Sequence, residues 1–156
     1  MLLINRGIVE MKKKFIIKNL VESHEIQASY DIKEYYDAVV KCRAYLESWL
    51  NEYIFVILYP DKAETTKENR QFVRKRFDDM YYQIQWLLEN NYFSKNDFDN
   101  LNKIRSFSDT VFRKGDVFKV CNLNELDKYI DISVYYCDKL KRLTREIIDQ
   151  VSLSSG

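Results

Sequence analysis

The clearest structural pattern in the chain lies at residues 31–59, DIKEYYDAVVKCRAYLESWLNEYIFVILY. Apolar side chains recur there at steps of three and four residues, the spacing that places them on one face of an α-helix. Asp31, followed three residues later by Glu34, has the pattern of a helix cap. The sequence therefore predicts a long amphipathic helix that ends before Pro60. Its last turns are apolar on nearly every side, so either other helices or a second subunit must enclose them.

Three further helices are predicted downstream of this one. Thr65 with Glu68 has the capping pattern for a second helix, which is expected to run to about residue 90. A third helix is expected over residues 94–114, and a last one from about residue 122 or 124 to residue 151. The intervening residues 116–122 are expected to form either a short extended segment or a structured loop. The predicted fold is all-α, an antiparallel four-helix bundle with a short N-terminal arm.

The predicted organisation is a single domain. The chain has 156 residues, enough for one hydrophobic core but not for two. Three Gly and one Pro are too few for the turns of a many-stranded β fold. We expect an N-terminal arm of uncertain structure at 1–30, the helical bundle domain at 31–151, and a flexible tail at 152–156.

The composition excludes several classes of function. Lys plus Arg number 25 and Asp plus Glu number 24, so no overall field attracts nucleic acid or an anionic membrane. The one histidine, His24, is too few for a zinc site and is expected to be exposed. The isolated glycines cannot form a phosphate-binding loop. The acidic residues considered for Mg²⁺ are expected on solvated helix faces instead, so no metal and no cofactor is predicted: Glu47, Asp78, Asp79, Asp97 and Asp99.

The compartment is predicted from the cysteines and the apolar runs. Cys42, Cys121 and Cys137 form no tightly spaced pair, which is typical of a reduced cytoplasmic protein, and all three, on or near apolar helix stripes, are expected in the core. The most apolar run, residues 54–59, is too short to cross a bilayer. Neither an export signal nor contact with a membrane is expected.

Two groups of side chains are candidates for binding. Arg70, Arg74, Lys75 and Arg76 form a basic cluster, which is either an ordinary solvated face or a phosphate-binding surface. Twelve tyrosines are many for this length, and adjacent pairs should place one ring inward and one outward: Tyr35-Tyr36, Tyr81-Tyr82 and Tyr135-Tyr136. The outward rings either contact another protein or extend the core.

Residues 101–115, LNKIRSFSDTVFRKG, resemble the signature helix of HEPN domains. These domains are ribonuclease-like four-helix bundles that are common in bacterial defence and toxin systems. Members typically read Leu-Asn-Lys-Ile-Arg, two further residues, Arg-Asn, a few residues, and then Ala-His-Gly. Residues 35–50 are similar to the opening helix of the family, with Glu47 at the place of its frequent acidic residue.

The resemblance implies a catalytic site that this chain has lost. In the family, an Arg and a His at a dimer interface cleave RNA, and the positions that correspond here hold Ser108-Asp109 and Arg113. Taking Arg105 as the motif arginine leaves no histidine after it. Arginine stays protonated and cannot act as a general base. No ribonuclease activity is therefore expected.

The sequence predicts a non-catalytic HEPN-like module that forms a homodimer and binds another protein, in a regulatory, immunity, toxin–antitoxin or anti-defence role. The resemblance implies that the degenerate motif lines the dimer cleft, with the residues Glu47, Arg105, Ser108, Asp109 and Arg113. The alternative is an RNA-binding protein or weak ribonuclease of a toxin or defence system. Its phosphate-binding residues would be Arg70, Arg74, Lys75, Arg76 and Lys114.

Overall fold

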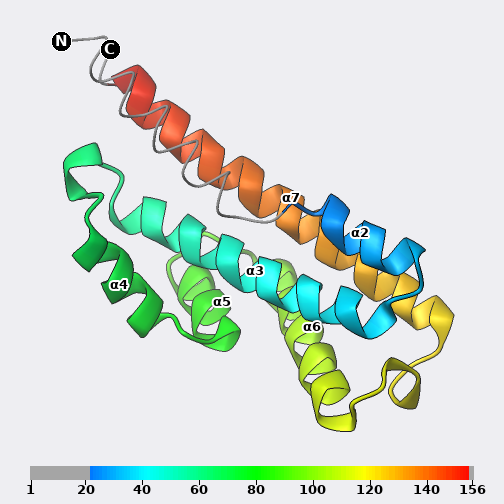
Figure 1. Ribbon diagram of the computed structural model, residues 1–156. Coiled ribbons are helices and arrows are strands. Elements are labelled where there is room, and N and C mark those ends of the chain that lie inside the picture. The colour runs from blue at the N-terminus through cyan, green and yellow to red at the C-terminus, as the bar shows by residue number, and fades with distance from the viewer. Residues whose placement is uncertain (1–21, 155–156) are drawn as a thin grey trace.

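The computed structural model describes residues 22–154, and every regular element in that range is helical. The predicted all-α class is therefore confirmed, while residues 1–21 of the predicted arm lie outside the described range. Figure 1 shows how the elements are arranged. The helices are α2 (His24–Asp31), α3 (Tyr35–Leu58), α4 (Lys67–Arg76), α5 (Met80–Glu89), α6 (Lys95–Lys114) and α7 (Leu123–Ser154), with 3-10 turns η1 (Lys62–Glu64) and η2 (Val117–Lys119).

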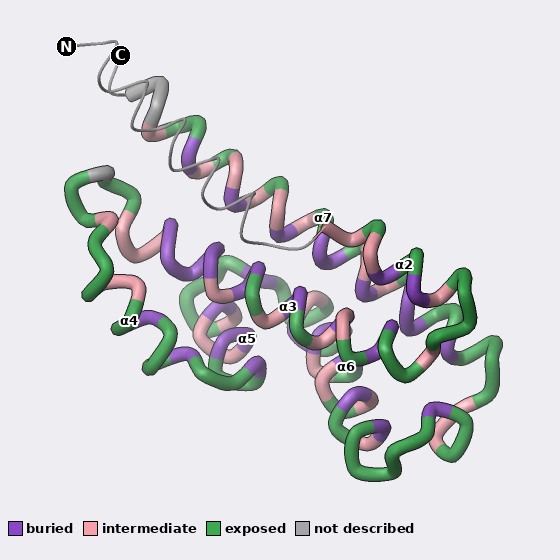
Figure 2. Tube along the Cα trace, viewed as in Figure 1, coloured by how far each residue is buried: buried purple, intermediate pink, exposed green. Residues whose placement is uncertain are grey.

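The central element is α3, which packs against α2, α4, α5, α6 and α7 (Figure 1). Half of its residues are buried, and Leu46, Trp49 and Leu50 have almost no exposed surface. Each such side chain contributes roughly 1.5–3 kcal/mol by leaving water. Figure 2 shows the buried residues following the inner faces of the helices around α3. The core is thus built around the segment with the strongest helical pattern in the sequence.

The apolar last turns of α3 are buried by the rest of the chain as far as Val56. Tyr53 and Phe55 are buried, and the ring of Tyr53 lies 6.1 Å from that of Phe93 and 6.2 Å from that of Tyr92. A second subunit is not needed to cover these rings. The helix ends at Leu58, before Pro60, as predicted.

Two predicted boundaries differ at the ends of the bundle. Residues 24–30, placed in the arm, form α2 with Asp31, and Ile26 of this helix is fully buried. The helix is tied to α3 because the Tyr45 hydroxyl donates to Glu25 at 3.0 Å. Asp31 therefore ends a helix instead of capping one, and Glu34 precedes α3 without a side-chain cap. At the other end, α7 continues to Ser154, into the predicted tail.

The predicted second helix is two helices. Thr66, not Thr65, caps α4 by accepting from the Asn69 N–H. The chain then breaks at residues 77–79, and Asp79 caps α5 by accepting from the Tyr81 N–H at 2.7 Å. The predicted apolar stripe is nevertheless buried on both sides of the break, at Val73, Phe77, Met80, Ile84 and Leu87.

The predicted third and last helices are confirmed as α6 and α7. Ser94 and Asp97 exchange hydrogen bonds in a capping box at the start of α6. Gly115 ends α6 with φ of +74°, a left-handed conformation that glycine adopts without strain. Asn122 and Glu125 form the same reciprocal arrangement at the start of α7. Between the two helices, residues 116–122 are a structured loop that contains η2.

Helix directions differ from a simple antiparallel bundle. Helices α2 and α6 run antiparallel to α3, but α7 runs in the same direction as α3 (Figure 1). Cys42 lies beside Ser133, and Tyr45 lies beside Cys137 further along both helices. The break between α4 and α5 adds a change of chain direction that the four-helix prediction did not contain. None of the helices within residues 22–154 is both long enough and apolar enough to cross a membrane.

Candidate functional site

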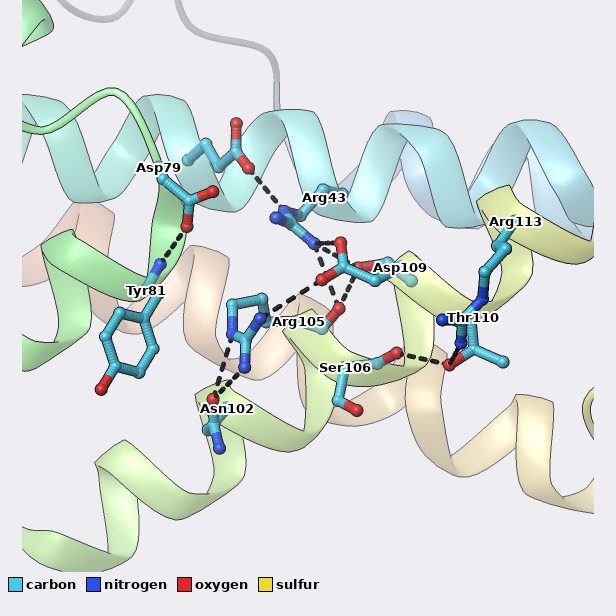
Figure 3. Close-up of polar contacts among 11 residues, drawn as sticks. Arg43, Asp79, Tyr81, Asn102, Arg105, Ser106, Asp109, Thr110 and Arg113 are labelled. Atoms are coloured by element: carbon cyan, nitrogen blue, oxygen red, sulfur yellow. Dashed lines mark hydrogen bonds and ion pairs between the residues drawn. The ribbon is translucent and has the colours of Figure 1, made fainter.

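The side chain of Arg43 joins α3 to α6 (Figure 3). Its Nη1 donates to the carbonyl oxygen of Arg105 at 3.1 Å, to Ser108 Oγ at 2.7 Å and to Asp109 Oδ1 at 2.8 Å. Its Nε donates to Glu47 Oε1, one turn further along α3. We call these five residues the Arg43 network. Four of the five predicted motif residues therefore meet around an arginine that the motif does not contain.

The Arg43 network holds a charge that is shielded from water but fully compensated. The Arg43 side chain is only 12% exposed. Burial by itself would lower the pKa of Arg43, but hydrogen bonds to Glu47 and Asp109 raise it above its usual value. Ser108 is fully buried, and its hydroxyl donates back to the Arg105 carbonyl at 2.9 Å. The network is thus a permanently charged connection between two helices.

Arg105 carries the network toward α5 (Figure 3). Its Nε and Nη2 donate to Asn102 Oδ1 at 3.0 and 2.9 Å, and its Nη1 lies 3.2 Å from Asp109 Oδ2. The guanidinium carbon is 5.4 Å from the centre of the Tyr81 ring. A cation over an aromatic face is a favourable contact. The donors of Arg105 therefore already have acceptors within the chain.

Arg113 and Lys114 lie apart from the network. Arg113 is exposed, and its contact within α6 is a 3.5 Å hydrogen bond to Thr110 Oγ1 (Figure 3). Lys114 is exposed in the last turn of α6. The structure thus brings the other four motif residues together but leaves Arg113 outside.

The predicted basic cluster is divided between inside and outside. Arg70 forms an ion pair with Glu52 at 2.6 Å, with both side chains about one-tenth exposed, and its guanidinium carbon is 4.3 Å from the Phe55 ring centre. Its contacts fasten α4 to α3. Arg74, Lys75 and Arg76 are exposed on α4. Three members of the cluster, and not four, are therefore open to a ligand.

Of the three predicted core cysteines, Cys42 and Cys137 are buried, as expected, whereas Cys121, in the loop between η2 and α7, is only partly buried. Burial raises the pKa of the Cys42 thiol to about 12 and the pKa of Cys137 well above its usual value. Both therefore remain protonated thiols at neutral pH, a form that is a poor nucleophile. Among the residues that the structure describes, no three His, Cys, Asp or Glu side chains are grouped to hold a metal ion.

One end of the molecule exposes a cluster of large apolar side chains, which we call the aromatic end. It gathers the C-terminus of α2, the N-terminus of α3, the C-terminus of α6, η2 and the N-terminus of α7 (Figure 1). Edge-to-face contacts join Tyr36 to Phe112 at 6.2 Å and Tyr35 to Phe118 at 5.4 Å. Its exposed members are Ile32, Tyr36, Val40, Phe112, Phe118 and Leu123.

The predicted tyrosine pairs divide into two kinds. Tyr136 is buried while Tyr135 is 56% exposed, and Tyr35 is half-buried while Tyr36 is exposed, as predicted. The prediction for Tyr81-Tyr82 is wrong, because both rings are exposed. The buried face of α5 includes Met80 and Gln83, and the two tyrosines between them both fall on the opposite, exposed side of the helix.

No protein-family model, curated protein or solved structure matches this chain. The function is therefore inferred from the geometry described above.

Proposed function

We propose that this protein is a non-catalytic, HEPN-like helical module that forms a homodimer and acts by binding another protein, in a regulatory, immunity or anti-defence role. The observation that carries the proposal is the aromatic end. Six large apolar side chains are exposed there, at the ends of five elements that the fold brings to one end of the molecule (Figure 1). Contiguous exposed apolar surface typically marks a site of protein contact, and aromatic rings supply much of the binding energy at such sites.

The chemistry available on α6 supports binding over catalysis. The family's motif positions hold Ser108, which is buried, and Arg113, which is exposed. His24, the sole histidine of the chain, lies on α2. General acid–base catalysis near neutral pH needs a group that can both give and take a proton, which arginine cannot do. The polar groups of the Arg43 network instead satisfy one another.

The position of the aromatic end supports a contact between two copies of the chain. It includes Phe112, on the same helix as the motif residues and one turn beyond Asp109. It also includes Tyr36, two turns before Arg43 on α3. The aromatic end therefore continues the seam between the two helices that carry the family resemblance. A symmetric dimer would bury the same patch of both copies.

The solution mass of the full chain tests this proposal. At micromolar concentration, wild type should have twice the chain mass of 18.9 kDa by light scattering after size exclusion. The double variant Phe112→Ser/Phe118→Ser should be monomeric. A matched control, Tyr82→Ser/Tyr135→Ser, removes exposed rings from α5 and α7 and should remain dimeric. A monomeric wild type, or equal dissociation of both double variants, would contradict the proposal.

RNA binding or weak RNA cleavage is the second candidate, and the exposed cations of α4 favour it. Two observations weaken this candidate. Arg70 is paired with Glu52, and Lys114 lies at the end of α6 that is far from α4 (Figure 1). Phosphate binding predicts an affinity that falls steeply with salt. We expect a labelled mixed-sequence RNA to remain intact and unbound with wild type. Cleavage that Arg113→Ala abolishes would favour the second candidate instead.

A further inference from the structure

The helix α4 concentrates positive charge in a chain that is almost neutral. Its ten residues, KENRQFVRKR, hold five basic side chains and one acidic side chain, a net charge of +4. The whole chain carries +1, so the remaining residues together carry −3. A local field of this kind attracts an oppositely charged partner even when the overall charge is small.

The basic side chains of α4 divide into one that is largely buried and several that are exposed. Arg70 turns inward to Glu52. Arg74, Lys75 and Arg76 are exposed, and within residues 22–154 no carboxylate lies at ion-pair distance from any of the three. Phe72, on the same helix, is 50% exposed. We call Phe72, Arg74, Lys75 and Arg76 the basic ridge.

Few residues of α4 contribute to the hydrophobic core. Val73 is the one residue of this helix that is buried, whereas α5, of equal length, buries four. The Thr66 cap and the Arg70–Glu52 ion pair hold α4 in place without using the basic ridge. The three cations of the ridge lie in the last turn of α4, where the helix dipole favours positive charge, so α4 tolerates them without a partner. The charge of the ridge is therefore available to an acidic ligand.

We propose that the basic ridge binds an acidic segment of a partner protein, with Phe72 as the apolar anchor. The inference rests on the proposed function, because it names the class of partner for a protein-binding module. Charge complementarity selects the acidic chemistry. Phe72 lies one helical turn before Lys75 and Arg76, so an exposed ring neighbours two cations on the helix surface, as at an interface with an aromatic anchor and a charged rim.

The shape of α4 favours a protein segment over a nucleic acid strand. Sites for single strands combine a basic groove with several aromatic rings on which successive bases stack. Here the cations lie on a convex helix about 15 Å long with one exposed ring. Asp78 and Asp79 are exposed directly after the ridge and would repel a continuing phosphate backbone. A short acidic segment needs only the length of the ridge.

The test uses the full chain and a fluorescein-labelled peptide of three Glu-Glu-Leu-Glu repeats, followed by anisotropy at about 50 and about 200 mM salt. The ridge variant Arg74→Gln/Lys75→Gln/Arg76→Gln should bind about tenfold more weakly than wild type at the lower salt. The control Lys103→Gln/Lys128→Gln/Arg142→Gln removes the same charge from exposed positions on α6 and α7 and should bind like wild type. Phe72→Ser should weaken binding about threefold with an unchanged salt dependence.

Two results would overturn the inference. One is absence of peptide binding at the lower salt, or an equal loss in the ridge and control variants. The other is tighter binding of a ten-nucleotide oligouridylate than of the peptide, with the loss confined to the ridge variant, which would assign the ridge to nucleic acid. The mass of each variant is measured in the same samples. A monomer that still binds the peptide would contradict the dimer alone, and a dimer that does not bind it would contradict the ridge alone.

Discussion

Arg43 shows how a single side chain can hold two helices in register. Its guanidinium group reaches four acceptors, three of them on α6, and its own helix supplies the fourth through Glu47. A buried cation is stable only where its hydrogen bonds and its charge are compensated. The register of α3 on α6 is therefore specified at Arg43 as well as by the apolar stripe.

Replacing Arg43 by Met should destabilise the fold by about 2 kcal/mol, because Ser108 and Asp109 lose their donor on α3. Urea unfolding followed by circular dichroism measures the change. The matched variant Arg105→Met removes a more exposed guanidinium, whose contacts lie on its own helix and over Tyr81, and should cost less than about 1 kcal/mol. Equal losses in the two variants would mean that Arg43 is not the connection between the helices.

Residue-level prediction from the sequence succeeded where the motif was local. The motif residues on α6 are close together in sequence, and Ser108 and Asp109 do share one site. Arg43 was missed because its acceptors lie 62 to 66 residues away. A signal was present, since Arg43 and Glu47 are spaced as an i,i+4 ion pair beside the apolar stripe of α3. That signal is common on exposed helices and does not by itself identify a buried contact.

At the scale of elements, the caps were the most informative features. The Ser94 and Asp97 capping box and the Gly115 stop were predicted from short sequence patterns because their hydrogen bonds are local. The break at residues 77–79 was not predicted, because the apolar stripe continues through it from Val73 to Leu87. Apolar periodicity predicts which side chains are buried. It does not reveal a change in chain direction that leaves the same side chains facing the core.

The cap that follows the break between α4 and α5 can be tested by mutation, with the adjacent residue as a control. Asp79→Ala removes the carboxylate that accepts from the Tyr81 N–H and should destabilise the protein by about 1 kcal/mol. Asp78→Ala changes an adjacent exposed carboxylate that is not the cap and should change stability by less than about 0.5 kcal/mol. Thermal unfolding of both variants makes the comparison. If Asp78→Ala costs as much as Asp79→Ala, then the cap does not define the start of α5.

Asp97 gives the contact of α6 with α7 a dependence on pH. Its partial burial would raise the pKa of Asp97, but hydrogen bonds from Tyr136 and Lys139, at 2.9 and 3.1 Å, hold it below 3.8. A depressed carboxyl pKa stabilises the fold above the unfolded value, and this stability is lost as the pH falls through the folded value. Acid should therefore weaken the contact below about pH 4.

The variant Asp97→Asn should be less stable than wild type at neutral pH and should lose less stability between pH 5 and pH 3, because its side chain does not titrate. The measurement is the urea midpoint across that range. Asp99→Asn is the control, since Asp99 is a half-exposed member of an i,i+4 pair with Lys95 on the same helix. Identical pH profiles for wild type and Asp97→Asn would show that Asp97 does not carry the effect.

At the scale of the whole molecule, the sequence predicted the class and not the arrangement. The amphipathic stripe of α3 correctly places this helix in the core. The stripe does not encode which helix covers it or in which direction that helix runs, so the parallel pairing of α3 with α7 was not predicted (Figure 1). The aromatic end was not predicted for the same reason. Its members come from five elements, which only folding brings to one end of the molecule (Figure 1).

Hydrogen exchange at two protein concentrations tests the central claim most directly, because it locates the contact between copies on the unmodified chain. Between nanomolar and micromolar protein, peptides covering residues 31–40 and 109–123 should become slower to exchange, while peptides from α4 should not change. That result would place the dimer contact at the aromatic end. Unchanged exchange at both segments, or protection that appears elsewhere, would contradict the claim.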